Sequence, residues 1–99
     1  MGGSQAAYVY ILSNDRGNVL YIGCTEDLKK RIYMHKKQLI AGFSKKYNAQ
    51  RLIYFRKFSS IEEAKKREKY LKCKTRAKKI ALIESFNPTR EDLSQDISS

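Results

Sequence analysis

Glu68 is the residue of this chain whose position is hardest to explain by folding alone. The stretch "SSIEEAKKREKYLK", residues 59–72, has the periodicity of a helix, and Glu68 falls inside its apolar stripe at 100° per residue. That stripe consists of Ile61, Ala64 and Leu71. An ionised carboxylate that faces a core costs several kcal/mol unless a cation pairs with it. The partner is either Lys or Arg, in which case Glu68 is structural, or a hard divalent cation such as Mg²⁺.

Arg31 and His35 are four residues apart, so they are neighbours on one helix face. Arg offers a planar fork of donors that matches phosphate. His35 is the only histidine, and therefore the only side chain whose ordinary pKa lies near neutrality. Each also has a structural interpretation, with His35 as a satisfied core residue and Arg31 as a solvated side chain at the edge of the apolar stripe.

Tyrosines gather in "YVYILSNDRGNVLYIG", residues 8–23, which holds three of the chain's seven. Tyr is a preferred strand residue, and cross-strand aromatic pairs stabilise hairpins. Packing therefore accounts for Tyr8, Tyr10 and Tyr21 without any chemistry. The alternative is that a phenol hydroxyl of Tyr10 or Tyr21 takes part in a reaction.

Basic residues cluster in "KKREK" and "KCKTRAKK", and the connection "FSKKYNAQ" is also basic. Such clusters bind the phosphates of nucleic acid, although they are often only solvated faces, and they say nothing about which bases are read. The candidate nucleic-acid-binding residues are Lys45, Lys46, Arg67, Lys72, Lys74, Arg76 and Lys78.

The elements that must position these residues begin with a hairpin. Residues 8–13 and 19–23 are rich in strand formers, and "SNDRGN" between them accepts the positive φ of a tight turn. Alternation divides the side chains of the first strand between two faces. Val9 and Ile11 fall on one face, and Tyr8, Tyr10 and Leu12 on the other.

A helix is predicted next, with Thr25 as its cap and Gly42 at its end. Glu26 and Asp27 occupy its first turn, where the helix dipole favours acids. Its apolar stripe is Leu28, Ile32, His35 and Leu39.

Residues 51–58 are predicted to form a third strand. Ser60 and Glu63 then fit the S-x-x-E capping box at the start of the helix that carries Glu68. A last helix in "TRAKKIALIESF" stops at Asn87-Pro88. Its inward residues are expected to be Ala77, Ile80 and Ala81.

The element order is therefore β-β-α-β-α-α, which predicts an α+β fold with a small antiparallel three-stranded sheet flanked by helices. The 99 residues suffice for one domain, which we expect to span 7–93 between a floppy start, 1–6, and a flexible tail, 94–99. The acidic stretch "TREDLSQDISS" is expected to be peripheral or frayed.

The net charge is the strongest signal in the composition. Lys and Arg total 21 against 10 Asp and Glu, so the formal charge is +11 and a polyanionic partner is expected. Nucleic acid fits better than membrane, because no helix pairs a bulky apolar face with a basic one and no apolar run could span a bilayer. No secretory signal is present, so we expect a cytoplasmic protein whose Cys24 and Cys73 stay reduced.

Several of these residues match, in order, the motifs of a known family. "YVY", residues 8–10, looks like a first motif that ends in Tyr. "YIG", residues 21–23, is the second, and its Tyr21 follows Tyr10 by 11 residues. The family's helix Arg follows the motif glycine by eight residues, as Arg31 follows Gly23. Its His lies one turn later, at His35.

The later helix extends the match, because "REKYLK", residues 67–72, is similar to the family's R-E-K-x-L-K run around its metal-binding Glu. Over residues 7–93, including "RAKKIALIE" and "NP", the sequence resembles the GIY-YIG nuclease superfamily, and more closely its small single-domain bacterial members. "YVY" replaces Gly-Ile-Tyr, Asn87 is the candidate for the family's later Asn, and no separate module for choosing DNA sites is seen.

The resemblance implies a role for five residues. Tyr10 would orient or deprotonate the attacking water, and Tyr21 would hydrogen-bond near the scissile phosphate. Arg31 would stabilise the charge of the pentavalent transition state. His35 would assist proton transfer or phosphate positioning. Glu68 would hold one divalent ion, Mg²⁺ or Mn²⁺, that stabilises the leaving oxygen.

The function implied is metal-dependent endonucleolytic hydrolysis of nucleic acid. DNA is the expected partner, in branched, nicked or single-stranded form, and repair or recombination is the expected context. The alternative is a nucleic-acid-binding domain that keeps the GIY-YIG scaffold without catalysis. A basic protein with no nucleic-acid role is a third interpretation.

Overall fold

The structure is a computed structural model that describes residues 6–17, 19–37 and 49–94. Its element order is the predicted β-β-α-β-α-α. The elements are β1 (Ala7–Ser13), β2 (Leu20–Thr25), α1 (Leu28–Lys36), β3 (Arg51–Phe58), α3 (Ile61–Lys72) and α4 (Arg76–Phe86).

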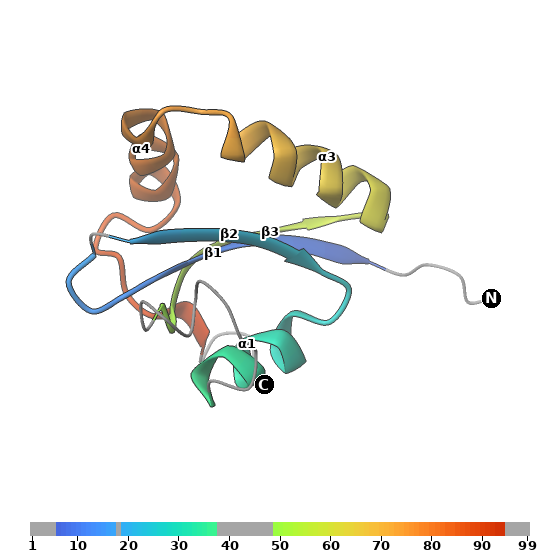
Figure 1. Cartoon of the computed structure of the whole chain (residues 1–99), viewed down its shortest axis with the longest axis horizontal. Helices are drawn as coiled ribbons and strands as arrows, with labels where there is room; N and C mark the ends of the chain where they lie inside the picture. The colour runs from blue at the N-terminus through green and yellow to red at the C-terminus, as the bar shows by residue number, and fades with distance from the viewer. Residues whose placement is uncertain (1–5, 18, 38–48, 95–99) are drawn as a thin grey trace.

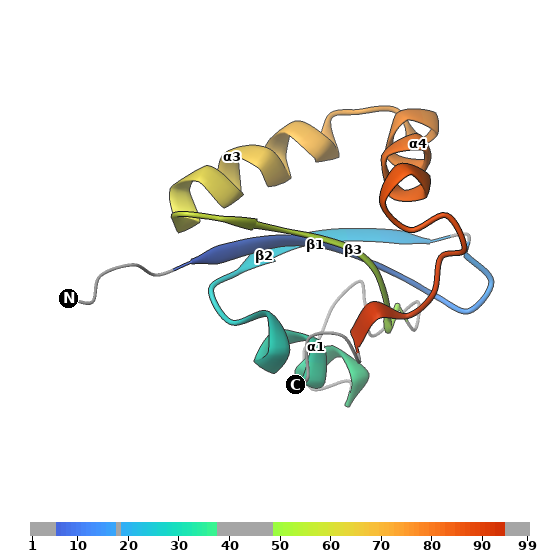
Figure 2. The same cartoon turned by 180° about the vertical axis from the view of Figure 1, so that it is seen from behind.

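The three strands form one antiparallel sheet in the order β2-β1-β3, so β2 and β3 are its edges. Helices α3 and α4 cover one face of this sheet, and α1 lies against the other (Figures 1 and 2). The hairpin turn needs its glycine, because Gly17 has a φ of +74° while its N–H donates to the carbonyl of Asn14 at 3.0 Å. The predicted α+β architecture is confirmed.

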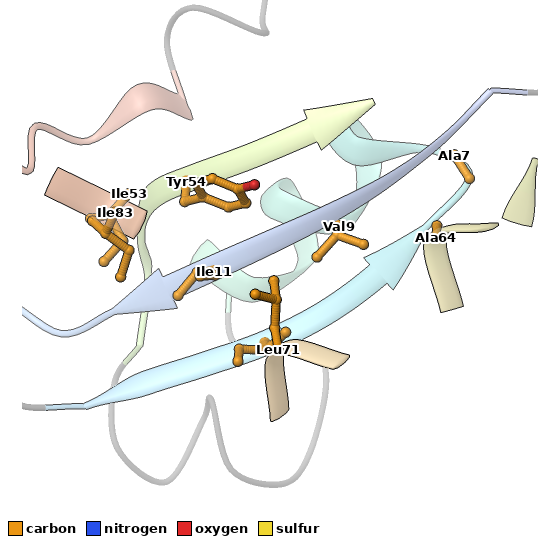
Figure 3. Close-up of a cluster of buried hydrophobic side chains, with 9 residues drawn as sticks. Ala7, Val9, Ile11, Ile53, Tyr54, Ala64, Leu71 and Ile83 are labelled. Atoms are coloured by element: carbon orange, nitrogen blue, oxygen red, sulfur yellow. The ribbon is translucent and has the colours of Figure 1, made fainter. Parts of the chain in front are cut away.

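Alternation along β1 separates two hydrophobic clusters, as predicted. Val9 and Ile11 point toward α3 and α4, where Leu71 and Ile83 pack against them (Figure 3). Tyr10 and Leu12 lie on the opposite face, and Tyr8 packs there half-buried. The cluster on that face also contains Leu28, Ile32, Ala49 and Leu52.

A β-bulge in β3 lets two consecutive residues enter the same cluster. Ile11 pairs with Tyr54 but Leu12 pairs with Leu52, so Ile53 is an extra residue on its strand. Ile53 and Tyr54 are therefore both buried toward α3 and α4, while Leu52 is returned to the α1 face.

The start and end of α1 differ from the prediction. Thr25 ends β2, and the cap is Asp27, whose carboxylate accepts from the Lys30 N–H at 3.0 Å. The Thr25 hydroxyl instead accepts from the Asp27 N–H at 3.1 Å and so fixes the turn between the two elements. The helix ends at Lys36 rather than at Gly42, and nothing in the sequence marks that end. Leu39 and Gly42 lie outside the described residues.

Helix α3 begins as predicted, because the Ser60 hydroxyl accepts from the Glu63 N–H at 3.2 Å. In α4 the predicted inward face is partly wrong, since Ala77 and Ala81 are exposed, whereas Ile83 is fully buried. Apolar residues occur nearly all round this helix, so periodicity alone does not select a face; contact with β3 does.

The chain after α4 returns to the sheet. Asp92 accepts from the Leu52 N–H at 3.2 Å and forms an ion pair with Lys36 at 2.7 Å, and Leu93 packs against the α1-side cluster. The expectation of a peripheral or frayed tail is therefore wrong up to Ser94, because these contacts tie residues 91–94 to β3 and α1. Among the described residues, no helix is long and apolar enough to cross a membrane.

Candidate functional site

Tyr10 is the centre of the site, and a glycine on the neighbouring strand makes room for it. Tyr10 pairs with Gly23 across the β1–β2 ladder. A Cβ added to Gly23 would lie 2.6 Å from Tyr10 Oη and 2.7 Å from its Cζ, closer than non-bonded atoms approach. The Tyr10 ring therefore lies across the glycine of "YIG", which explains why that position carries no side chain.

Three rings from three elements meet beside this glycine. The Tyr10 hydroxyl is linked to His35 Nε2 by a hydrogen bond of 3.2 Å. The Tyr21 ring centroid lies 5.4 Å from that of His35 and 6.4 Å from that of Tyr10. Tyr10 and His35 are 1% and 3% exposed, whereas Tyr21 is half-buried. Tyr10 and Tyr21 therefore do pack, as the structural interpretation expected, and the Tyr10 hydroxyl is also hydrogen-bonded to the one histidine of the chain.

Burial governs the protonation of this group. It raises the pKa of Tyr10 well above its ordinary value, and the nearby Tyr21 adds to the rise while Arg31 opposes it. Burial and, to a smaller extent, the charge of Arg31 together lower the pKa of His35 from 6.5 to about 4. Tyr10 therefore keeps its proton near neutral pH, and His35 is a neutral imidazole that is able to accept one.

Arg31 projects from α1 into a cavity of about 650 Å³ at the end of β2. The side chain is half-buried and couples electrostatically to both Tyr10 and His35. Two further cations, Lys30 and Lys65, line the same cavity. The other lining residues are Cys24, Thr25, Glu26, Asp27, Met34 and Ile61.

Glu68 reaches β2 from the opposite face of the sheet. Its Oε2 forms an ion pair with Lys72 at 2.9 Å, and its Oε1 accepts a hydrogen bond from the Cys24 thiol at 3.1 Å. The side chain is 21% exposed, so the structural partner considered from the sequence is present in Lys72. Its charge also reaches Tyr10, whose pKa it raises.

Cys24 follows "YIG" directly, and sequence reasoning gave it no role. Burial, the hydrogen bond to Glu68 and the charge of Glu68 raise the pKa of the thiol to about 11. The thiol is therefore protonated near neutral pH and remains a donor to the carboxylate. In the sequence, only its position immediately after the glycine of "YIG" indicated that Cys24 lies near the site.

The donor set suits a hard cation only in part. Within the described residues, no group of three or more His, Cys, Asp or Glu could hold a metal ion. Glu68 is a single carboxylate whose hydrogen-bond donor, Cys24, lines the cavity of about 650 Å³. One carboxylate suits Mg²⁺ or Mn²⁺ because these ions keep several waters and take substrate phosphate as a further ligand. The residues present therefore fit a site of one protein ligand.

The predicted nucleic-acid-binding residues lie along α3, α4 and the turn between them. The exceptions are Lys45 and Lys46, which lie outside the described residues. Lys72, Arg76 and Lys78 are exposed, and Arg67 and Lys74 are half-buried. Arg67 Cζ and Lys74 Nζ lie 4.7 and 4.3 Å from the centroid of the Tyr70 ring, which is 48% exposed. A hydrogen bond from Lys74 and its charge lower the pKa of Tyr70.

Asn87 is not part of this site. It caps α4, and its Nδ2 donates to the carbonyls of Ile53 at 3.2 Å and Glu91 at 2.8 Å. Ile53 belongs to β3, the edge strand opposite β2. The candidate for the later Asn is therefore a structural residue that joins α4 to the far side of the sheet.

Comparison with known proteins agrees with the geometry. A family model described as the GIY-YIG catalytic domain matches residues 6–81. A UPF0213 protein of Clostridium perfringens is 36% identical over 91 residues, which cover 92% of this chain and 97% of the relative. One of Streptococcus pneumoniae is 37% identical over 88 residues, which cover 89% and 87%.

A solved structure is also similar. The solution NMR structure of the UPF0213 protein BH0048 from Bacillus halodurans has a TM-score of 0.57 and 31% sequence identity. The match covers 95% of this chain and 98% of that protein.

Proposed function

The chain belongs to the GIY-YIG family of nucleases, and from this premise we propose that it is a metal-dependent endonuclease that hydrolyses phosphodiester bonds in DNA. One observation carries the proposal: Tyr10 is hydrogen-bonded to His35 and coupled electrostatically to Tyr21, Arg31 and Glu68. These residues come from four elements and from both faces of the sheet.

The proposed role of Arg31 follows from its place in the cavity. Its guanidinium is a permanent cation with a planar array of donors, and Lys30 and Lys65 add positive charge around it. A scissile phosphate held there meets a charge that is already in position when negative charge develops on its equatorial oxygens. Tyr21, half-buried beside His35, would hydrogen-bond the same phosphate.

Tyr10 and His35 are proposed to handle the proton of the attacking water. In the tautomer with its proton on Nδ1, His35 accepts from the Tyr10 hydroxyl through Nε2. Water then loses a proton to the Tyr10 oxygen as Tyr10 passes its own to His35, so neutral imidazole becomes imidazolium and no free phenolate forms. The raised pKa of Tyr10 and the lowered pKa of His35 provide the starting forms that the step needs, a protonated phenol and a neutral imidazole, but both shifts oppose the transfer itself.

Glu68 would hold the divalent cation through one carboxylate oxygen. When bound there, the ion would supply Lewis-acid stabilisation of the leaving oxygen. The protein's own contribution is to keep the carboxylate oriented toward β2, which the Cys24 thiol does through Oε1.

A cleavage assay tests the proposal. Branched, nicked and single-stranded DNA would be incubated with the full chain and Mg²⁺ or Mn²⁺. Glu68→Gln is expected to lower the cleavage rate by about 10²-fold or more, while Glu62→Gln, on the exposed side of the same helix, leaves it unchanged. The proposal fails if the wild-type chain cuts none of these substrates, or if Glu68→Gln cuts as well as wild type.

A second candidate function is nucleic-acid binding without cleavage. It is favoured by the burial of Tyr10 and His35, and by the ion pair that already satisfies Glu68. Binding without cleavage predicts salt-sensitive association with DNA or RNA that needs no metal and is unaffected by Tyr10→Phe. The same assay, combined with a binding measurement in chelator, distinguishes the two candidates.

A further inference from the structure

Two lysines flank the outer edge of β2 on the face covered by α3 and α4. Lys72, from the end of α3, and Lys79, from α4, line a cavity of about 260 Å³ against this strand. The remaining lining residues are Leu20, Tyr21 and Ile22. Among the described residues Lys79 forms no ion pair. An anion that enters this cavity meets two ammonium groups, and their Coulomb attraction favours its binding.

Lys72 is also the cation that neutralises Glu68. Its Nζ lies 2.9 Å from Glu68 Oε2, and its side chain is 56% exposed against 21% for Glu68. Exposed ion pairs within one helix are weak, so Lys72 exchanges one anion for another at little cost. The carboxylate stays where it is, because the Cys24 thiol holds its other oxygen at 3.1 Å.

We propose that this cavity, lined by Lys72 and Lys79, binds a phosphate of nucleic acid, and that the phosphate draws Lys72 away from Glu68 and frees Oε2 for a divalent cation. The inference rests on the proposed function, in which Glu68 holds that cation. Cation binding and nucleic-acid binding are then coupled through one lysine, and by linkage each strengthens the other by the same factor. The chain would bind the cation weakly until nucleic acid is in place.

The test measures Mn²⁺ binding by the paramagnetic resonance of the free ion, with the full chain, alone and with a phosphorothioate DNA duplex that resists cleavage. The duplex titrated without protein provides the reference for Mn²⁺ bound by DNA. Four proteins are compared: wild type, Lys72→Met, Lys79→Met and Lys69→Met. Lys69 is an exposed lysine of α3 and controls for the loss of one positive charge.

Without DNA, Lys72→Met is expected to bind Mn²⁺ about two- to five-fold more tightly than wild type, the range that exposed ion pairs supply. Lys79→Met and Lys69→Met are expected to match each other, because neither lysine contacts Glu68. With DNA, wild type and Lys69→Met gain Mn²⁺ affinity. The gain is smaller in Lys72→Met, which has no ion pair to release, and in Lys79→Met, which has lost half of the phosphate site.

Equal Mn²⁺ affinities for Lys72→Met and Lys69→Met, or equal gains with DNA in all four proteins, would overturn the coupling. The endonuclease proposal would survive that result, since it depends on the difference between wild type and Glu68→Gln. Glu68→Gln is measured in the same way. If it binds Mn²⁺ as tightly as Lys72→Met does, Glu68 is not the metal ligand, and both the coupling and the metal-binding role of Glu68 in the endonuclease proposal are wrong.

The role of Cys24 is tested in the same measurement. Cys24→Ser keeps a donor to Oε1 and is expected to bind Mn²⁺ like wild type, whereas Cys24→Ala is expected to bind it more weakly because the carboxylate loses its fixed orientation. Identical Mn²⁺ affinities for Cys24→Ala and Cys24→Ser would show that the thiol does not position Glu68.

Discussion

The two groups of predicted site residues are held by the fold in opposite ways. Tyr10 and His35 are buried and bonded to each other against Gly23, where an added methyl group would collide with the phenol. Arg76 and Lys78, on α4, are exposed and depend on no such fit. The role proposed for the first group requires exact placement, so single changes in it should be costly. The role proposed for the second requires only summed charge, so its members should be nearly interchangeable.

Substitution of Arg31 is expected to have the largest effect on the cleavage rate. It also tests whether the position of a cation matters more than its charge. Arg31→Met should lower the cleavage rate by about 10²- to 10³-fold, as the loss of one preorganised donor to a transition state does. Lys30→Met removes a neighbouring charge from the same cavity and should change the rate only a few-fold. Single-turnover cleavage rates of the two variants are compared. Equal losses of rate would mean that Arg31 acts through its charge alone, as the exposed basic residues of α4 are expected to do.

Gly23→Ala tests the fit around Tyr10. Its new Cβ would lie 2.6 Å from the buried Tyr10 hydroxyl, so we expect a loss of about 1–3 kcal/mol in the free energy of unfolding. The control is Gly17→Ala, where the Cβ meets its nearest atom at 3.5 Å and only the positive φ is unfavourable. Urea denaturation measures both, and a Gly23→Ala variant as stable as wild type would show that the site is not tightly packed.

His35 should make stability depend on pH. Its pKa is 6.5 in an ordinary environment and about 4 in the fold, so between these values the unfolded chain binds more protons at this residue. Stability is therefore retained above pH 6.5 and falls as the pH is lowered toward 4, by at most about 1.4 kcal/mol per pH unit. The measurement is the slope of unfolding free energy against pH. His35→Gln should have a shallower slope than wild type. A slope identical to that of wild type would mean that His35 is solvated in the folded protein.

Lys78 represents the exposed group and has the smallest expected effect. Lys78→Met should weaken DNA binding only a few-fold and reduce the slope of log affinity against log salt by about 0.9. Lys57→Met, at an exposed position of the edge strand β3 and on neither α3 nor α4, should leave that slope unchanged. Fluorescence anisotropy over a range of salt concentrations measures both slopes. If Lys78→Met has the same slope as wild type, Lys78 does not contact nucleic acid.

Much of the fold was predictable because local patterns and packing agree. The bounds of β3 at 51–58 and the Ser60 cap of α3 follow from residue type and spacing, and alternation along β1 correctly separates Val9 from Tyr10. The prediction was wrong where local signals were ambiguous. Thr25 and Asp27 are both good caps, and α4 has apolar residues on several sides, so only contacts with the rest of the chain choose between the options.

The sequence by itself determined which residues are proposed to carry the chemistry, because a motif records residue type and spacing along the chain. Tyr10, Tyr21, Arg31, His35 and Glu68 were named in that way. Only the tertiary structure decided which side chains contact these residues. The contacts of Cys24 with Glu68, of Lys72 with the same carboxylate, and of Tyr10 with His35 join different elements or depend on side-chain direction. Burial, which sets the pKa of Tyr10 and His35, is likewise a property of the assembled sheet and helices, and one-dimensional periodicity does not contain it.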